Sequence, residues 1–275
     1  MGLGLRRVLG IAAVCLAAAC TPASAPAPTA SPAPGPPPGF RTGWGPAPKL
    51  LRIMPLGDSI TYGVGSTDSA GYRARLEQRL SAAGMRVDFV GSRDGGPAGA
   101  DDDNEGHSGW TISRTARKVD RWLAAYRPDV VLLHIGTNDV RLNGYRAGAA
   151  KRLGVLLNRI RRDRPAAHIF VARIAGSRQP ALQRWIAAYN IGVARIVAAR
   201  DDPLLHLVDQ AAVRAPRLHP NDAGYAAMAD TWFTALTSAT TLRDLGVVVG
   251  TNADGVRIRA TTTPRSRRVQ PVVER

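Results

Sequence analysis

The feature that most constrains this chain is an apolar run at residues 50–56, which ends abruptly in Gly57-Asp58-Ser59. A helix-like segment follows from Gly71, so the pattern predicts a strand, a tight turn and then a helix. In open α/β sheets, such turns lie at the carboxyl ends of the strands, where ligands bind. The sequence therefore predicts that Ser59 lies at the functional edge of a sheet.

Strand and helix patterns alternate along the rest of the chain. Strands are predicted at residues 51–56, 86–90, 130–135, 169–174 and 204–208. Helices are predicted at residues 72–83, 113–126, 147–162, 180–199 and 223–237. The run at 130–135 is apolar throughout, which is typical of a central parallel strand covered on both faces. This alternation predicts an α/β fold with a doubly wound, mainly five-stranded parallel sheet.

The first 48 residues do not follow this pattern. Residues 1–20 join a basic start to an apolar run that is short for a membrane span and fits an export signal. The run ends at Cys20 in a pattern that resembles a bacterial lipoprotein signal. We therefore expect export and anchoring at the cell-surface membrane through a lipid on Cys20, with cleavage and secretion as the alternative. The Ala- and Pro-rich residues 21–48 predict an extended linker.

Residues 49–240 are expected to form one domain, followed by a different C-terminal segment. Within residues 241–275, the pattern around 247–259 favours a short hairpin, and a polar, basic tail follows. Cys15 and Cys20 are the only two cysteines of the sequence. The domain therefore has no disulfide and no thiolate metal site.

The formal net charge of +16 raises the question of nucleic-acid binding. The charge comes almost wholly from arginines, which are scattered over every predicted helix and concentrated again in the tail. They are not interleaved with aromatic residues, and no nucleic-acid-binding motif is present. We therefore expect no nucleic-acid partner. The basic tail could instead be attracted to anionic lipid or cell-wall polymer.

The residues at the predicted strand ends suit ester hydrolysis, which needs a nucleophile, a base and donors for the oxyanion. Ser59 is the candidate nucleophile, although a serine in this turn could equally cap a helix. His219 follows the last strand and immediately precedes the last helix, so it is the candidate base, whereas His134 is expected to be a packed core residue. The backbone N–H groups of Ser59 and Gly91 and the side-chain amide of Asn138 are candidate donors.

Four blocks at these positions resemble the SGNH or GDSL hydrolase superfamily. They contain Ser59 (57–60), Gly91 (88–92), Asn138 (136–139) and His219. The stretches 53–61, 88–92 and 105–110 resemble carbohydrate esterase family three in particular, whose members are mostly acetylxylan esterases. The resemblance implies a flavodoxin-like three-layer sandwich, an acyl-enzyme on Ser59 and removal of acetyl groups from carbohydrate without a cofactor or metal.

One departure from the family pattern affects the histidine. The family usually has an Asp three residues before the catalytic His, whereas this chain has Pro216 there. Asp209 is a candidate to orient the imidazole instead, and so is Asp222, although Asp222 is expected to cap the last helix. Arg217 would disfavour the imidazolium. We expect a Ser–His dyad of reduced activity, and a glycan- or cell-wall-binding descendant without turnover is the alternative.

Three further residues are candidates for substrate binding. Asp58 neighbours the nucleophile and could contact substrate, although it is better suited to fix the turn. His107 and Trp110 lie in a Gly-rich loop and could line a sugar subsite, since a Trp face fits the apolar side of a pyranose. A packed loop would explain them equally well. A general short-chain lipase or thioesterase is the alternative enzyme, and acyl-chain preference would separate it from an acetyl esterase.

Overall fold

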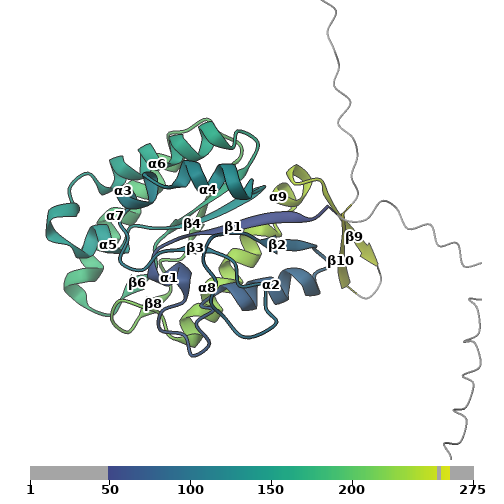
Figure 1. The fold of residues 1–275 in the computed structure, drawn as a ribbon, viewed down its shortest axis with the longest axis horizontal. Helices are drawn as coiled ribbons and strands as arrows, with labels where there is room; N and C mark the ends of the chain where they lie inside the picture. Colours follow the sequence, from purple (N-terminus) through teal and green to yellow (C-terminus); the bar gives the residue numbers. More distant parts are fainter. Residues whose placement is uncertain (1–48, 253–254, 261–275) are drawn as a thin grey trace, which may run out of the picture. The chain divides into compact units, whose positions relative to one another are not determined.

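The structure, a computed structural model, describes residues 49–252 and 255–260. Cys20, the linker at 21–48 and the basic tail at 261–275 lie outside the described residues. Five parallel strands form the central sheet in the order β2-β1-β4-β5-β7, and the short β3 (Glu105–Gly106) pairs with the end of β1 (Figure 1). The five strands are β1 (Leu51–Gly57), β2 (Val87–Phe89), β4 (Val130–His134), β5 (His168–Arg173) and β7 (Leu205–Asp209).

This arrangement confirms the predicted α/β fold with a mainly five-stranded parallel sheet. The chain passes from β1 outward to β2 and then crosses over to β4, β5 and β7. This order is the flavodoxin-like one, in which the ligand crevice lies where the direction of winding reverses. The reversal falls at β1, the strand that leads into Ser59.

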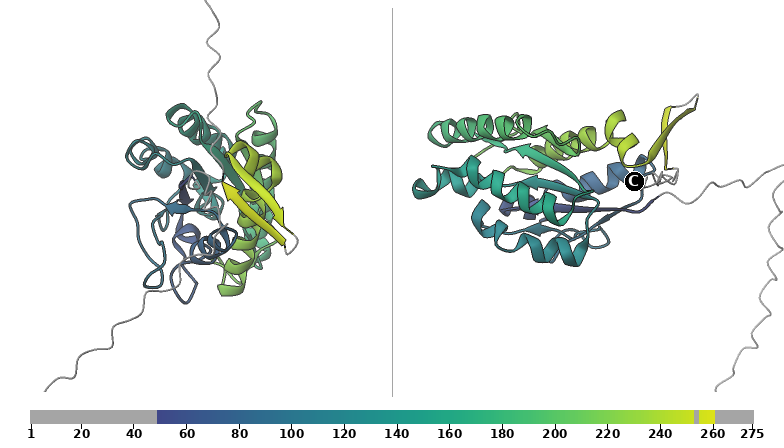
Figure 2. Two further views of the ribbon diagram at one scale, coloured as in Figure 1. Left: turned by 90° about the vertical axis from the view of Figure 1, so that its right-hand side faces the viewer. Right: turned by 90° about the horizontal axis from the view of Figure 1, so that it is seen from above.

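Helices cover both faces of the sheet and make three layers (Figures 1 and 2). One face carries α2 (Arg73–Ala82) and α8 (Asp222–Leu236). The other carries α3 (Ile112–Ala116), α4 (Val119–Tyr126), α6 (Ala149–Asp163) and α7 (Pro180–Ala198). The single helix predicted at 113–126 is thus two helices. The Lys118 N–H bonds to the Thr115 carbonyl three residues back, a 3₁₀-type closure that ends α3.

The protein has a hydrophobic core on each face of the sheet, because successive side chains of a strand point to opposite faces. In β4, Val130 and Leu132 pack into the cluster under α2 and α8, whereas Val131 and Leu133 pack into the cluster under α4, α6 and α7. His134 at the end of this strand is fully buried, and its Nε2 accepts a hydrogen bond from the Ala175 N–H at 3.1 Å. Burial lowers the pKa of His134 to about 4, so it is a neutral core residue, as the sequence predicts.

The packed region continues beyond residue 240. Leu242 of α9 (Ala239–Asp244) and the following Leu245 are buried in the cluster under α8. After them, β9 (Val247–Asn252) and β10 (Gly255–Ala260) pair antiparallel in the segment where the sequence predicts a hairpin. Over residues 49–252 and 255–260, the helices are all too short or too polar to cross a membrane.

Candidate active site

In the turn after β1, the helix-capping bond is made by Asp58 and not by Ser59. Asp58 is the N-cap of α1 (Ser59–Tyr62), because its Oδ1 accepts a hydrogen bond from the Ile60 N–H at 3.0 Å. Gly57 is required before it, since a Cβ there would lie 2.2 Å from the His134 carbonyl oxygen. Of the two roles open to Ser59 in the sequence, the capping role is therefore filled by its neighbour.

Ser59 and His219 meet across 160 residues of sequence. The Ser59 Oγ lies 2.8 Å from His219 Nε2. Ser59 opens α1 at the carboxyl end of β1, and His219 lies in the loop that precedes α8. The Ser59 side chain is 7 % exposed, so the pair lies just below the surface. This is the distance at which a histidine can take a proton from a serine hydroxyl.

The surroundings of His219 keep its imidazole neutral. Burial lowers its pKa below the ordinary value of 6.5, and the positive charge of Arg141 lowers it further. A neutral imidazole has one acceptor nitrogen. In the tautomer that carries its proton on Nδ1, Nε2 is the acceptor that faces the Ser59 hydroxyl.

The loop that carries His219 is held by a small parallel sheet. In it, β6 (Gly176–Ser177) pairs with β8 (Arg214–Ala215). Beyond the pairing, the Ser177 hydroxyl donates a hydrogen bond to the Arg217 carbonyl at 2.6 Å. These bonds fix the backbone two residues before His219. Sequence analysis missed Ser177, because a two-residue strand leaves no hydrophobic pattern.

The two acidic residues predicted as orienters are bonded elsewhere. Asp209 pairs with Arg173 (2.8 Å between Oδ2 and Nη1) and accepts the Ala211 N–H. Asp222 accepts the N–H of Thr67 at 2.9 Å. Across the described residues, neither makes a hydrogen bond to His219, nor does any other carboxylate.

The expected capping role of Asp222 was wrong. The N-cap of α8 is Asn221, whose side-chain oxygen accepts the Gly224 N–H at 3.1 Å. Asn221 has the extended backbone of an N-cap residue, whereas Asp222 is already the first helical residue. The carboxylate of Asp222 instead ties the start of α8 to the loop that follows α1.

The candidate oxyanion donors lie on both sides of Ser59. Gly91 follows β2 and Asn138 lies in α5 (Thr137–Arg141) after β4, and these two strands flank β1. One Asn138 amide N–H donates to the Trp110 carbonyl at 2.9 Å, which leaves the second N–H for a ligand. A Cβ at Gly91 would lie 2.1 Å from the Asn104 carbonyl oxygen, so only glycine fits beside that backbone.

Comparison with known proteins identifies the family. Residues 56–227 match the model of the GDSL-like Lipase/Acylhydrolase family. The chain belongs to this family. The membership inferred from the four motif blocks is confirmed, and it makes the protein an esterase or acylhydrolase.

Several relatives of this GDSL-like hydrolase are esterases. A family 3 carbohydrate esterase from Clostridium thermocellum is 36 % identical, with a TM-score of 0.60 over 68 % of this chain and 94 % of that one. A family 3 carbohydrate esterase from Talaromyces cellulolyticus is 27 % identical, with a TM-score of 0.59 over 68 % and 96 %. A multidomain esterase from Ruminococcus flavefaciens is 31 % identical over 220 residues, which cover 66 % of this chain but 28 % of that protein.

Two of the predicted substrate-binding residues are structural in this GDSL-like hydrolase. Asp58 is fully buried and fixes the turn after β1, the role that the sequence favours over contact with substrate. Burial raises the pKa of Asp58 to about 7. His107 is stacked between Trp110 (4.2 Å between ring centroids) and Trp122 (4.7 Å), and its Nε2 lies 2.7 Å from Glu105 Oε2.

Trp110, the third candidate, is partly exposed at the surface. It is half-buried and lines a cavity of about 300 Å³ together with Ser92, Lys118 and Trp122. Ser92 directly follows the candidate oxyanion donor Gly91. The packed His107 thus supports an aromatic wall close to the candidate active site of this GDSL-like hydrolase.

Sequence analysis also missed Arg73, a fully buried cation behind the nucleophile turn. Its guanidinium donates hydrogen bonds to five backbone carbonyls, those of Thr61, Tyr62, Ser69, Gly95 and Asp102. Three of these carbonyls contact Nη2, which has two N–H groups, so one of its N–H groups is shared between two acceptors. A lysine, with three donors on a point charge, could not reach all five carbonyls. Arg73 therefore ties α1 to the loop that precedes α2 and to the loop between β2 and β3. Its only sequence signal is a basic residue at the start of α2.

Proposed function

We propose that this GDSL-like hydrolase is a serine esterase that removes acetyl groups from O-acetylated carbohydrate. The observation that carries the proposal is the 2.8 Å contact between Ser59 Oγ and His219 Nε2 at the carboxyl end of β1. The carbohydrate substrate is supported by the similarity to two family 3 carbohydrate esterases. The acetyl group is what the resemblance to acetylxylan esterases implies.

In the acylation step, Ser59 attacks the ester carbonyl carbon as its proton passes to His219 Nε2. The carbonyl oxygen becomes an oxyanion, which accepts hydrogen bonds from the N–H groups of Ser59 and Gly91 and from the free amide N–H of Asn138. His219 then gives its proton to the departing sugar oxygen. The products are a sugar hydroxyl and an acetyl ester on Ser59.

In the deacylation step, water attacks the acetyl ester while His219 takes its proton. The same three donors hold the second oxyanion. Collapse of the intermediate passes the His219 proton to Ser59 Oγ and releases acetic acid, which loses its remaining proton to solvent as acetate. Besides the ester, the reactant from outside the chain in these two steps is one water molecule.

The proposal is tested by acetate release from O-acetylated xylo-oligosaccharides, compared with hydrolysis of p-nitrophenyl octanoate and an acetyl thioester. We expect kcat/KM to be highest for the acetylated saccharide. Faster hydrolysis of the octanoyl ester would favour a general lipase, and faster hydrolysis of the thioester would favour a thioesterase. Either result would contradict the carbohydrate assignment.

The second candidate function is a glycan-binding protein without turnover. One observation favours it: His219 has no carboxylate partner among the described residues, and Pro216 stands where the family has an Asp. In that case the chain would bind O-acetylated saccharide but release no acetate above the rate of a Ser59→Ala variant.

We also propose that the protein is exported and held at the cell surface by a lipid on Cys20. The proposal rests on the sequence of residues 1–20, because Cys20 lies outside the described residues. Metabolic labelling with palmitate is expected to mark the full chain and not a Cys20→Ser variant. Equal labelling of both proteins, or none of either, would contradict the anchor.

A further inference from the structure

A basic cavity of about 260 Å³ lies beside the candidate active site. Its lining includes Arg141 at the end of α5, Arg146, Gln179 and Trp185 near the start of α7, and Arg217 and Leu218 before His219. Three arginines thus converge on one small space, and no Asp or Glu is among the residues that line it. Such a lining is suited to a negatively charged group.

Three residues of the cavity lining are close in sequence to the proposed catalytic groups. Arg217 and Leu218 are the two residues immediately before His219. Arg141 lies three residues after Asn138 in α5, so the two side chains share one face of the helix. The charge of Arg141 also reaches the imidazole, since it lowers the pKa of His219. A group in the cavity would therefore lie next to an ester bound at Ser59.

Protein carboxylates do not neutralise these three arginines. In the part of the chain that the structure describes, the guanidinium groups of Arg141 and Arg217 make no hydrogen bond or ion pair. Arg146 donates from Nε to the Val140 carbonyl at 2.8 Å and lies over the Trp185 ring at 4.6 Å. These contacts orient Arg146 and leave its terminal N–H groups for a ligand.

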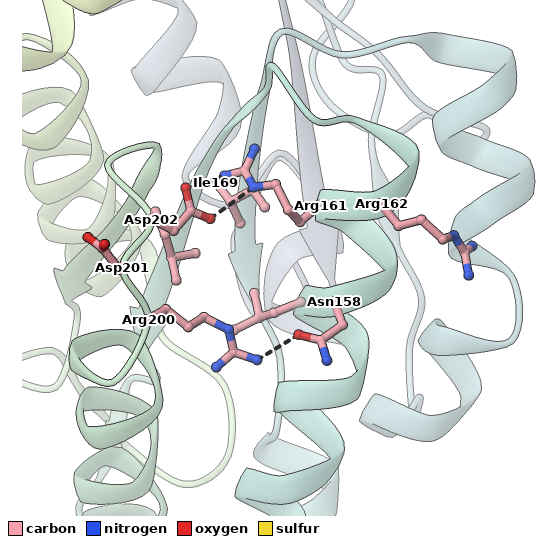
Figure 3. Close-up of a pocket in the computed structure, with 9 residues that line it drawn as sticks. Asn158, Arg161, Arg162, Ile169, Arg200, Asp201 and Asp202 are labelled. Carbon is pink, nitrogen blue, oxygen red and sulfur yellow. Dashed lines mark hydrogen bonds and ion pairs between the residues drawn. The ribbon is translucent and has the colours of Figure 1, made fainter.

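In a second basic cavity of the same molecule, the arginines are paired with other residues of the protein. This cavity measures about 440 Å³ and is lined in part by Ile169 and Leu205, at the amino ends of β5 and β7, whereas Ser59 follows the carboxyl end of β1. Figure 3 shows Ile169 and the charged residues of this lining. There Arg161 forms a two-point ion pair with Asp202, at 2.9 and 3.1 Å, and Arg200 donates to Asn158 at 3.0 Å. Its arginines are therefore satisfied by the protein itself.

We propose that the cavity formed by Arg141, Arg146 and Arg217 binds an anionic group on the acetylated saccharide, which makes acidic glycans the preferred substrates. The inference rests on the proposed function and names its substrate class. Guanidinium groups match the planar geometry of a carboxylate, such as that of a uronic acid, and also bind phosphate. Trp185 lies in the same lining and offers a flat apolar surface to the sugar ring.

The binding test uses a Ser59→Ala protein, which would bind substrate without hydrolysing it. Calorimetry compares acetylated methyl glucuronide with its uncharged amide, which has nearly the same shape. We expect the acid to bind about tenfold more tightly than the amide, the effect of one hydrogen bond to a charged group. This preference should shrink as salt is added. Equal affinities would overturn the proposal.

Variants assign the preference to this cavity. Arg141→Gln combined with Arg217→Gln in the Ser59→Ala background should abolish the preference for the acid. Arg195→Gln is the matched control, because Arg195 is also an exposed arginine but lies ten residues beyond Trp185 along α7. Thermal unfolding checks that each variant is folded. An unchanged preference in the double variant, or an equal loss in Arg195→Gln, would overturn the proposal.

Measuring turnover by the wild-type protein distinguishes a failure of the anionic subsite from a failure of the proposed esterase activity. Equal kcat/KM for the acid and the amide would contradict the anionic subsite and leave the esterase standing. Charge-selective binding without turnover would support the subsite and contradict the esterase. An acetylated sugar phosphate forms a third arm. If it binds more tightly than the glucuronide, the anion is a phosphate; if it binds more weakly, the anion is a carboxylate.

Discussion

The Ser177 hydroxyl donates a 2.6 Å hydrogen bond to the Arg217 carbonyl and thereby holds the loop that carries His219. The Ser177 hydroxyl also accepts the Gln179 N–H, and its side chain is buried. No carboxylate orients His219 among the described residues. The position of the imidazole therefore depends on this backbone tether, and Ser177 acts as a positioning residue.

Replacing Ser177 by Ala should lower kcat for p-nitrophenyl acetate by roughly three- to tenfold, the net effect of one hydrogen bond. KM should change less, because substrate does not contact Ser177. Ser177→Thr keeps the hydroxyl and should restore most of the rate. Ser238→Ala removes the cap of α9 and should lower stability but not kcat. If Ser177→Ala retains full kcat, the tether is not needed for positioning.

Pro216→Asp should raise kcat, because it restores an acidic residue three positions before His219. In serine proteases, loss of the orienting carboxylate lowers kcat about 10⁴-fold, so even partial recovery here should be measurable. The carboxylate would also stabilise the imidazolium and raise the pKa of His219. Pro216→Asn supplies the same size without charge and serves as the control. An equal rate for the Asp and Asn variants would contradict this account.

The pH profile should report the lowered pKa of His219. The base is active when neutral, so kcat/KM should rise with pH and reach its plateau with a midpoint below 6.5. Arg141→Gln removes a positive charge that disfavours the imidazolium, so the midpoint should move to higher pH. Arg195→Gln should leave it in place. A midpoint that does not respond to Arg141 would show that its charge does not reach the imidazole.

Asp58→Asn should alter the pH dependence of stability. Burial raises the pKa of Asp58 from 3.8 to about 7, so the folded protein binds one more proton than the unfolded chain between these values. The stabilisation from this proton is complete below pH 3.8 and is lost as pH rises through about 7. The asparagine keeps the acceptor for the Ile60 N–H but has no charge to bury.

Urea unfolding of wild type and Asp58→Asn at pH 4 and pH 8 measures this effect. The stability of wild type relative to the variant should fall between these pH values by an amount on the order of 4 kcal/mol at most. A difference between the two proteins that is the same at both pH values would contradict the raised pKa.

Arg73→Lys should destabilise the protein by about 3–5 kcal/mol, as expected when a buried charge loses its partners. Lysine has three donors on a point charge and cannot satisfy the five carbonyls that Arg73 contacts. Arg75→Lys is the control on the same helix, since Arg75 is exposed and pairs with Asp230. Arg75→Lys should lower the free energy of unfolding by about 0–1 kcal/mol. Equal unfolding free energies for the two variants would contradict the role of Arg73.

The sheet could be predicted from the sequence because each strand carries a local signal. The apolar run of β4 and the Gly-Asp-Ser turn after β1 are short patterns that can be recognised from adjacent residues alone. The alternation of strands and helices predicted a doubly wound parallel sheet, and the flavodoxin-like arrangement was implied by the family resemblance. The two-residue strands β3, β6 and β8 have no such signal, and they were missed.

Within the site, sequence reasoning selected Ser59 and His219 but could not choose between capping and catalysis for the serine. That choice depends on Asp58 taking the capping bond, which is a matter of backbone angle rather than residue type. The Asp222 prediction failed because Asn221 makes the capping bond of α8, whereas Asp58 fixes the turn after β1, as the sequence favours. The contacts of Arg73 and Ser177 join distant segments, so no local pattern could reveal them.

In the proposed mechanism, Ser59 is the nucleophile and His219 the base. The deciding measurement is hydrolysis of p-nitrophenyl acetate with residues 40–275, beside Ser59→Ala and His219→Ala proteins of matched thermal stability. We expect turnover by the wild-type protein that both substitutions reduce to the background rate. Turnover that survives either substitution, or wild-type turnover no higher than that of the two variants, would contradict this mechanism.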